Sequence, residues 1–158
     1  MRLTNYTDYS LRVLIFLASK PKGNLSNISE IAAAYQISKN HLMKIIHELG
    51  KMGVITTIRG RGGGIKLAVP PSEINIGTIV RKTEEDFHLV PCFEKGDAYC
   101  AISPVCGLKH VLYKALDAYL AVLDEYSLAD LVVKPENYRT LLGIGDIDLS
   151  STKKNKDN

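Results

Sequence analysis

Three cysteines lie within a stretch of fifteen residues and are the side chains most able to do chemistry. Seven residues separate Cys92 from Cys100, and five separate Cys100 from Cys106. Gly96 and Pro104 interrupt this stretch, so we expect a loop on which the three thiols can converge. Thiolate ligands favour zinc or an iron-sulfur cluster over a hard cation. Because the Cys-x-x-Cys pair of most structural zinc sites is missing, the spacing leaves two interpretations open, a metal centre or three unligated cysteines.

A four-coordinate centre would need one more ligand, because the chain contains three cysteines in all. His88 and His110 lie nearby in the sequence, although histidines at such positions are more often ordinary surface or helix residues. Asp8, His41 and His47 lie far from the loop. Asp8 falls in the first turn of a predicted helix, where a carboxylate ordinarily interacts with the helix dipole. Spacing therefore does not determine the fourth ligand.

A second set of polar side chains is typical of a protein that binds nucleic acid. In a helix-turn-helix, the start of the second helix faces the base edges in the major groove. Here that stretch opens the predicted helix 39–51, and its donors suit phosphates and bases, whereas a solvated helix face is the plainer alternative. The candidate DNA-binding residues on it are Ser38, Lys39, Asn40, His41 and Lys44.

Two arginines in a glycine-rich turn, Arg59 and Arg61, complete the candidate DNA-binding surface. Negative potential is concentrated in a narrow minor groove, so an arginine at a hairpin tip suits that groove or a phosphate. The glycines at 60 and 62–64 do not form a nucleotide-binding loop, because the Walker spacing and the following helix are both missing. The turn is therefore a candidate for DNA binding, with an ordinary charged hairpin tip as the plainer alternative.

Periodic apolar residues predict the elements that position these side chains. Residues 6–19 repeat apolar positions at helical spacing, Asn27 opens a short second helix, and Ser38 caps the third. The β-prone segments 54–58 and 65–69 are joined by the glycine-rich turn. We predict a mainly α fold, which is a winged helix-turn-helix with a β-hairpin wing, followed by a cysteine loop and a long dimerisation helix.

The second half of the chain contains one long apolar helix. Residues 108–123 repeat apolar positions at spacings of three and four. Such a helix in a small domain needs a partner, and the same helix of a second subunit would give a two-fold homodimer. We predict a winged helix-turn-helix domain over 1–74, whose first helix also packs in the dimer, a cluster-binding loop and dimerisation helices over 75–142, and a disordered tail over 143–158.

Composition and charge exclude several classes of protein. The chain has 158 residues, 46% of them hydrophobic, and no apolar run approaches the roughly 18 to 20 residues of a membrane span. The first residues suggest no secretory signal, so we expect a cytoplasmic protein without a disulfide framework. Residues 1–69 hold ten Lys and Arg against three Asp and Glu, whereas residues 70–158 hold ten against fourteen. A basic half joined to an acidic half indicates a nucleic-acid-binding module linked to a different function.

The order of these features resembles the family of iron-sulfur winged-helix transcriptional repressors, and within it the nitric-oxide-sensing repressors of bacilli. The similarity extends over nearly the whole chain, to about residue 142. Its most specific matches are LTNYTDYSLR (3–12), ISKNHLMK (37–44), IRGRGGG (58–64) and ISPVCGLKH (102–110). The resemblance implies a homodimer that binds double-stranded operator DNA and holds one [4Fe-4S] cluster per subunit, in preference to a [2Fe-2S] cluster.

The resemblance also implies the ligands and the signal. Three cysteines hold the cluster in the family, and they fall here on Cys92, Cys100 and Cys106. The fourth ligand is a carboxylate from the first helix of the other subunit, which falls on Asp8. The resemblance implies nitric oxide as the signal, and oxygen ligation leaves one iron position more labile than thiolate ligation, so that nitric oxide could enter there. Loss of the link between Asp8 and the cysteines would release DNA and allow the repressed genes to be expressed.

Three other functions are compatible with parts of the sequence. A related iron-sulfur or redox-sensing regulator would share the fold and the cysteines but respond to a different signal. A DNA-binding protein with a structural zinc site would use the same loop. An enzyme or electron carrier is disfavoured, since no cofactor loop and no Ser/His/Asp or paired-carboxylate arrangement stands out. We therefore expect a transcription regulator rather than an enzyme.

Overall fold

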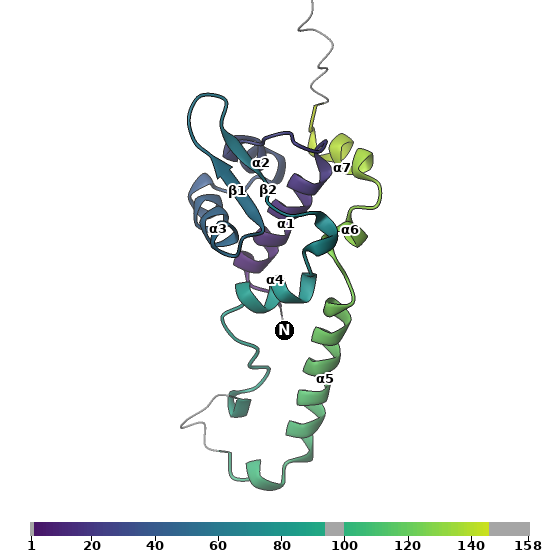
Figure 1. The fold of residues 1–158 in the computed structure, drawn as a ribbon. Helices are drawn as coiled ribbons and strands as arrows, with labels where there is room; N and C mark the ends of the chain where they lie inside the picture. Colours follow the sequence, from purple (N-terminus) through teal and green to yellow (C-terminus); the bar gives the residue numbers. More distant parts are fainter. Residues whose placement is uncertain (1, 94–99, 146–158) are drawn as a thin grey trace, which may run out of the picture.

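The computed structural model describes residues 2–93 and 100–145, and within them the chain is mainly helical. Figure 1 shows the small sheet and most of the other helices gathered around α1, while α5 extends away from them. This architecture confirms the predicted winged helix-turn-helix followed by a long helix. The elements are α1 (Asn5–Ser19), α2 (Ile28–Tyr35), α3 (Lys39–Lys51), β1 (Ile55–Ile58), β2 (Gly64–Leu67), α4 (Ile76–Thr83), α5 (Gly107–Asp124), α6 (Leu128–Leu131) and α7 (Pro135–Leu142).

The helix-turn-helix forms because polar caps start its two helices and apolar residues hold them against α1. The Asn27 side chain accepts a hydrogen bond from the Glu30 backbone N–H at 2.9 Å, and the Ser38 hydroxyl accepts one from the His41 N–H at 3.3 Å. Between the helices, Gln36 adopts a left-handed conformation with φ 54°, which ends α2. Four apolar residues of α3 are buried: Leu42, Ile45, Ile46 and Leu49.

The wing is an antiparallel hairpin of β1 and β2 that packs on the helices. Its register pairs Ile58 with Gly64, and Ile55 and Ile65 are buried in the core. Ser26, which precedes α2, forms a short bridge to the hairpin. Its N–H donates to the Ile65 carbonyl at 2.9 Å, and its carbonyl accepts from the Ile65 N–H at 2.7 Å. The bridge holds the wing against the helix-turn-helix.

Gly64 is required by the close approach of the wing to the loop before α2. A Cβ at this position would lie 2.8 Å from the Ser26 carbonyl oxygen and 2.9 Å from the Leu25 Cβ. We expect Gly64→Ala to lower the free energy of unfolding by roughly 1–3 kcal/mol, as overpacking does. Gly50→Ala is the matched control, because its Cβ would meet nothing within 4 Å and alanine favours the helix α3. Equal stability of the two variants in chemical denaturation would contradict the prediction.

One core joins the winged helix-turn-helix to the chain beyond residue 74. Helices α4, α6 and α7 pack against α1. Ile79, Leu128 and Ile144 are buried in the same apolar cluster as the core residues of α1. The core therefore crosses the predicted domain boundary and includes the first residues of the predicted tail. The rest of that tail, residues 146–158, lies outside the described residues.

The sequence patterns do not predict helix α7. Its apolar side chains are few, and Leu141 is 86% exposed, so the helical periodicity is weak. Hydrogen bonds to other elements hold it in place. The Arg139 guanidinium donates to the Ser19 carbonyl at the end of α1 at 3.2 Å, and the Tyr138 hydroxyl donates to the Leu131 carbonyl at 2.8 Å. Helix α7 is thus positioned by contacts that leave no local signal.

Helix α5 lies largely outside the core. Leu116 is its sole buried residue. Its C-terminal end is fixed to α4, because Asp124 forms a two-point ion pair with Arg81, and the hydrogen bonds from Arg81 lower the pKa of Asp124. None of the described helices combines the length and the hydropathy of a membrane span. Large apolar side chains stay exposed along α5, namely Leu108, Val111 and Val122.

Candidate functional site

The residues predicted to read DNA lie together at the start of α3. The hydroxyl of Ser38 caps the helix, so this residue also has a structural role. The ring of His41 lies 6.4 Å from the ring of Tyr9 on α1, measured between centroids. The start of α3 therefore presents a row of polar donors to solvent. All five predicted residues are exposed: Ser38, Lys39, Asn40, His41 and Lys44.

The tip of the wing carries Arg59 and Arg61, which are exposed just beyond the end of β1. Gly60 and Gly62 have φ values of 95° and 80°, which explains why the turn contains glycine. A groove of about 760 Å³ separates the wing from α3, and His47 and Arg59 are among its lining residues. We refer to it as the wing groove. Helix α3 and the wing thus border one concave surface.

The three cysteines lie on the chain between α4 and α5, and all of them are free and half-buried. Cys92 lies in a single 3-10 turn, and Cys106 is the N-cap residue of α5. Phe93, the neighbour of Cys92, stacks on Tyr113 of α5 with ring centroids 3.9 Å apart. This contact holds the turn that carries Cys92 beside the N-terminal half of the helix that begins after Cys106.

Cys100 follows residues 94–99, which lie outside the described part of the chain. Within the described part, no three His, Cys, Asp or Glu side chains of one chain come together as a metal site. Convergence of the three thiols therefore stays a prediction. Of the local candidates for a fourth ligand, His88 faces Asp86 with Nδ1 and Oδ1 3.8 Å apart, and His110 is exposed on α5.

Asp8 lies in the first turn of α1, as predicted, and forms an ion pair that the sequence reasoning missed. Its Oδ2 is 2.9 Å from Nε of Arg12. The Arg12 guanidinium lies 5.7 Å from the centroid of the Tyr35 ring at the end of α2. Burial raises the pKa of Tyr35 to about 12, and Arg12 partly opposes this shift. The i,i+4 spacing of an acid and a base is the signal that indicates the Asp8–Arg12 pair.

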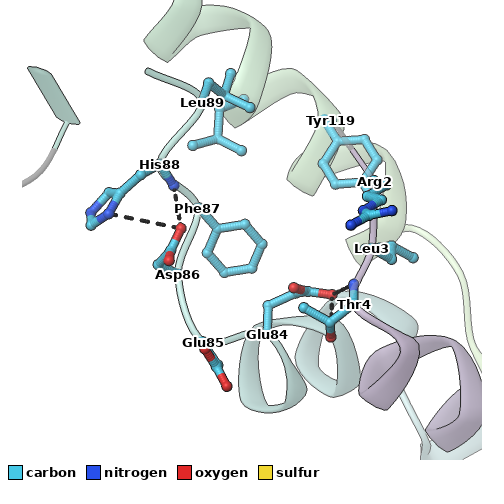
Figure 2. A pocket seen from close by; sticks show the side chains of 11 residues that line it. Arg2, Leu3, Thr4, Glu84, Glu85, Asp86, Phe87, His88, Leu89 and Tyr119 are labelled. Carbon is cyan, nitrogen blue, oxygen red and sulfur yellow. Dashed lines mark hydrogen bonds and ion pairs between the residues drawn. The ribbon is translucent and has the colours of Figure 1, made fainter. Parts of the chain in front are cut away.

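Glu84 connects the segment that leads to the cysteines with the start of α1. Its Oε1 accepts hydrogen bonds from the Thr4 backbone N–H at 2.8 Å and from the Thr4 hydroxyl at 3.2 Å (Figure 2). Glu84 ends α4, and Thr4 is the N-cap of α1, one turn before Asp8. Both residues line a cavity of about 520 Å³ together with Phe87 and Tyr119. The carboxylate therefore holds α1 at the point where the cysteine-bearing segment leaves the core.

We expect Glu84→Ala to lower the free energy of unfolding by about 1–2 kcal/mol. Hydrogen bonds to a charged group contribute about 1.5–3 kcal/mol, and partial exposure of Glu84 reduces this value. Glu85→Ala is the matched control, because Glu85 is the exposed neighbour in the same segment. Chemical denaturation measures the free energy of unfolding of both variants. If Glu84→Ala is as stable as Glu85→Ala, the bonds to Thr4 contribute nothing measurable.

The donor set fits a thiolate-bound centre. Three free thiols on one half of the chain are accompanied by a carboxylate, Asp8, on the other half, and its side chain is 42% exposed. Soft thiolates select iron-sulfur clusters or zinc, whereas hard cations prefer oxygen ligands. Cys92, Cys100, Cys106 and Asp8 are therefore chemically able to hold an iron-sulfur cluster.

The chain is similar to a family of transcription regulators. The model of the Rrf2 family, described as an iron-dependent transcriptional regulator, matches residues 3–134. The chain is 64% identical to the HTH-type transcriptional regulator NsrR of Bacillus subtilis over 142 residues, which cover 90% of this chain and 97% of the relative. It is 57% identical to NsrR of Oceanobacillus iheyensis over 144 residues, which cover 91% of this chain and 98% of the relative.

Solved structures share the fold. CymR, the global cysteine regulator of B. subtilis, matches with a TM-score of 0.67 and 26% identity, covering 84% of this chain and 97% of CymR. IscR of T. potens matches with a TM-score of 0.69 and 25% identity, covering 88% of this chain and 91% of IscR. Because its relatives regulate transcription, the protein is a DNA-binding regulator and not an enzyme. The chain belongs to the Rrf2 family of transcriptional regulators.

Proposed function

We propose that this protein is a repressor that binds operator DNA as a homodimer and releases it when nitric oxide attacks an iron-sulfur cluster. The observation that carries the proposal is the place of three free cysteines, between the DNA-binding half and a long helix with exposed apolar residues. Its family is described as iron-dependent, and relatives 64% and 61% identical over 90% of the chain are named NsrR. The sequence resemblance to nitric-oxide-sensing repressors supplies the signal.

A second copy of the chain is the proposed cover for the apolar side of α5. Leu108, Val111 and Val122 are 64%, 61% and 53% exposed, and with the exposed Ala115 they follow one side of the helix. We call these four residues the apolar stripe. The same stripe on a second α5 is self-complementary, as a two-fold interface requires. Such a dimer would present two α3 helices to the two half-sites of one operator.

Cys92, Cys100 and Cys106 are the proposed cluster ligands from one protomer, and Asp8 of the partner subunit is the proposed fourth. A bound [4Fe-4S] cluster supplies the iron that reacts with nitric oxide. Asp8 is suited to serve a partner because its carboxylate is 42% exposed at the start of α1. A hard carboxylate is a poorer match to a soft centre than a thiolate is. Among the four proposed ligands, Asp8 is therefore the one that we propose binds the cluster most weakly.

Side chains next to Asp8 on α1 contact both helices of the helix-turn-helix. Tyr9 contacts the ring of His41 on α3, and Arg12, which binds Asp8, lies over Tyr35 at the end of α2. Asp8 is thus connected to α2 through Arg12, and its neighbour in the sequence, Tyr9, contacts α3; we propose that these contacts couple the ligand site to the helix-turn-helix. When the cysteine-bearing loop of one protomer holds Asp8 of the partner subunit, we expect α3 to adopt the orientation that binds the operator.

Titration of nitric oxide into anaerobically purified protein on operator DNA tests the proposal. We expect the visible absorption of the cluster and the operator affinity to fall together. The expected loss of affinity is about 5- to 150-fold, the usual size of an allosteric coupling. Unchanged affinity after the absorption has disappeared would contradict the proposal. Iron and sulfide counts on the same preparation distinguish a cluster from a structural zinc ion.

A further inference from the structure

Met43 is an apolar side chain in the middle of the surface that α3 offers to DNA. The core side of α3 is complete without it, since four other apolar residues of the helix are buried. Met43 itself is 54% exposed. At helical spacing it shares one side of α3 with Asn40, Lys44 and His47, all of which are exposed. Met43 thus lies among polar donors rather than among core residues.

The surroundings of Met43 are concave, which distinguishes it from an apolar residue scattered on an open surface. Met43 lines the wing groove together with His47 and Arg59. Ile46 and Ile55 line the same groove and are 9% and 3% exposed, so they belong to its floor. A group that enters beside Met43 therefore meets an apolar floor and a rim of nitrogen donors.

We propose that Met43 contacts the C5-methyl group of a thymine in the major groove of each operator half-site. This methyl is the apolar group that base pairs present in the major groove, and apolar side chains of a reading helix pack against it. The thioether chain of methionine is flexible and polarisable, so it adapts to a small methyl group. The inference rests on the DNA-binding face proposed above and adds a base-specific contact made without a hydrogen bond.

The contact is tested by removing the methyl group from the DNA and the thioether from the protein. The full-length, anaerobically purified protein first selects an operator duplex from a random pool. Each thymine of that duplex is then replaced by deoxyuridine, which lacks only the C5-methyl. At one thymine of each half-site, we expect binding to weaken about fourfold, as burial of one methyl-sized group implies. Met43→Ala removes the contact from both half-sites of the dimer, so it is expected to lose about the square of that factor, roughly 15-fold, on the thymine duplex and to be insensitive to the deoxyuridine.

Two further variants separate methyl recognition from general effects on binding. Lys44→Ala removes a charge from the same side of α3 and is expected to weaken thymine and deoxyuridine duplexes by one common factor. Met43→Leu keeps an apolar side chain and is expected to retain part of the discrimination.

The outcomes separate failure of this inference from failure of the proposed function. If the wild-type protein binds every deoxyuridine duplex as tightly as the thymine duplex, the Met43 contact is refuted while operator binding stands. The Met43 contact is likewise refuted if Met43→Ala discriminates between thymine and deoxyuridine duplexes as strongly as the wild-type protein does. If no sequence is selected from the pool, the proposed operator binding is refuted and the Met43 contact with it.

Discussion

Replacing Cys106 with serine is expected to give a folded protein that has lost both its cluster and its response to nitric oxide. Cys106 is the N-cap of α5, and its side chain makes no capping hydrogen bond. Serine is among the favoured N-cap residues, so Cys106→Ser keeps the start of α5 intact. A hydroxyl does not replace a thiolate as a ligand of a soft iron-sulfur centre. The substitution therefore separates loss of the thiolate from loss of structure.

Anaerobic absorption spectra with iron and sulfide counts measure the cluster, and operator binding with and without nitric oxide measures the response. For Cys106→Ser we expect almost no iron and an affinity equal to that of the nitric-oxide-treated wild-type protein, about 5- to 150-fold below the untreated one. Ser103→Ala is the matched control, because Ser103 lies on the 3-10 turn just before Cys106. It should leave both measurements unchanged. Full iron and sulfide content in Cys106→Ser would exclude Cys106 as a ligand.

Local patterns predict those parts of the fold that local interactions form. The Asn27 and Ser38 caps start α2 and α3 because each side chain bonds a backbone N–H three residues further on, which a sequence shows directly. The wing is predicted by its glycines and β-prone residues. Its second strand begins at Gly64, one residue earlier than predicted, because pairing with Ile58 outweighs the low strand propensity of glycine.

Contacts between distant residues explain what the sequence does not show. The bond from Thr4 to Glu84 spans 80 residues, and the bond from Arg139 to Ser19 spans 120. Neither produces a periodic signal, so neither the position of Glu84 nor helix α7 follows from local patterns. The proposed DNA-binding residues are easier to predict, because helix-turn-helix geometry determines which end of the second helix faces the groove. A ligand set shared between two protomers leaves no pattern that spacing in one chain can reveal.

A charge in the apolar stripe of α5 is expected to break the proposed dimer. Val111 is 61% exposed in one protomer, so Val111→Lys should scarcely change the stability of the isolated chain. In a two-fold dimer, however, each new lysine would face the partner's apolar stripe. A buried charge without a counter-charge costs about 3–5 kcal/mol, so we expect the dissociation constant of the dimer to rise at least about 100-fold. Analytical ultracentrifugation measures this change.

The same substitution is expected to weaken operator binding by about 10²- to 10⁴-fold, because a monomer loses the gain from contacting two linked half-sites. Electrostatics cannot explain such a loss, since an added lysine favours binding to phosphates. Asp117→Lys adds a lysine at an exposed position on the other side of α5 and should leave the dimer and its operator affinity intact. A dimeric Val111→Lys protein would exclude this stripe as the interface. A monomeric Val111→Lys protein with undiminished affinity would instead show that one half-site suffices for recognition.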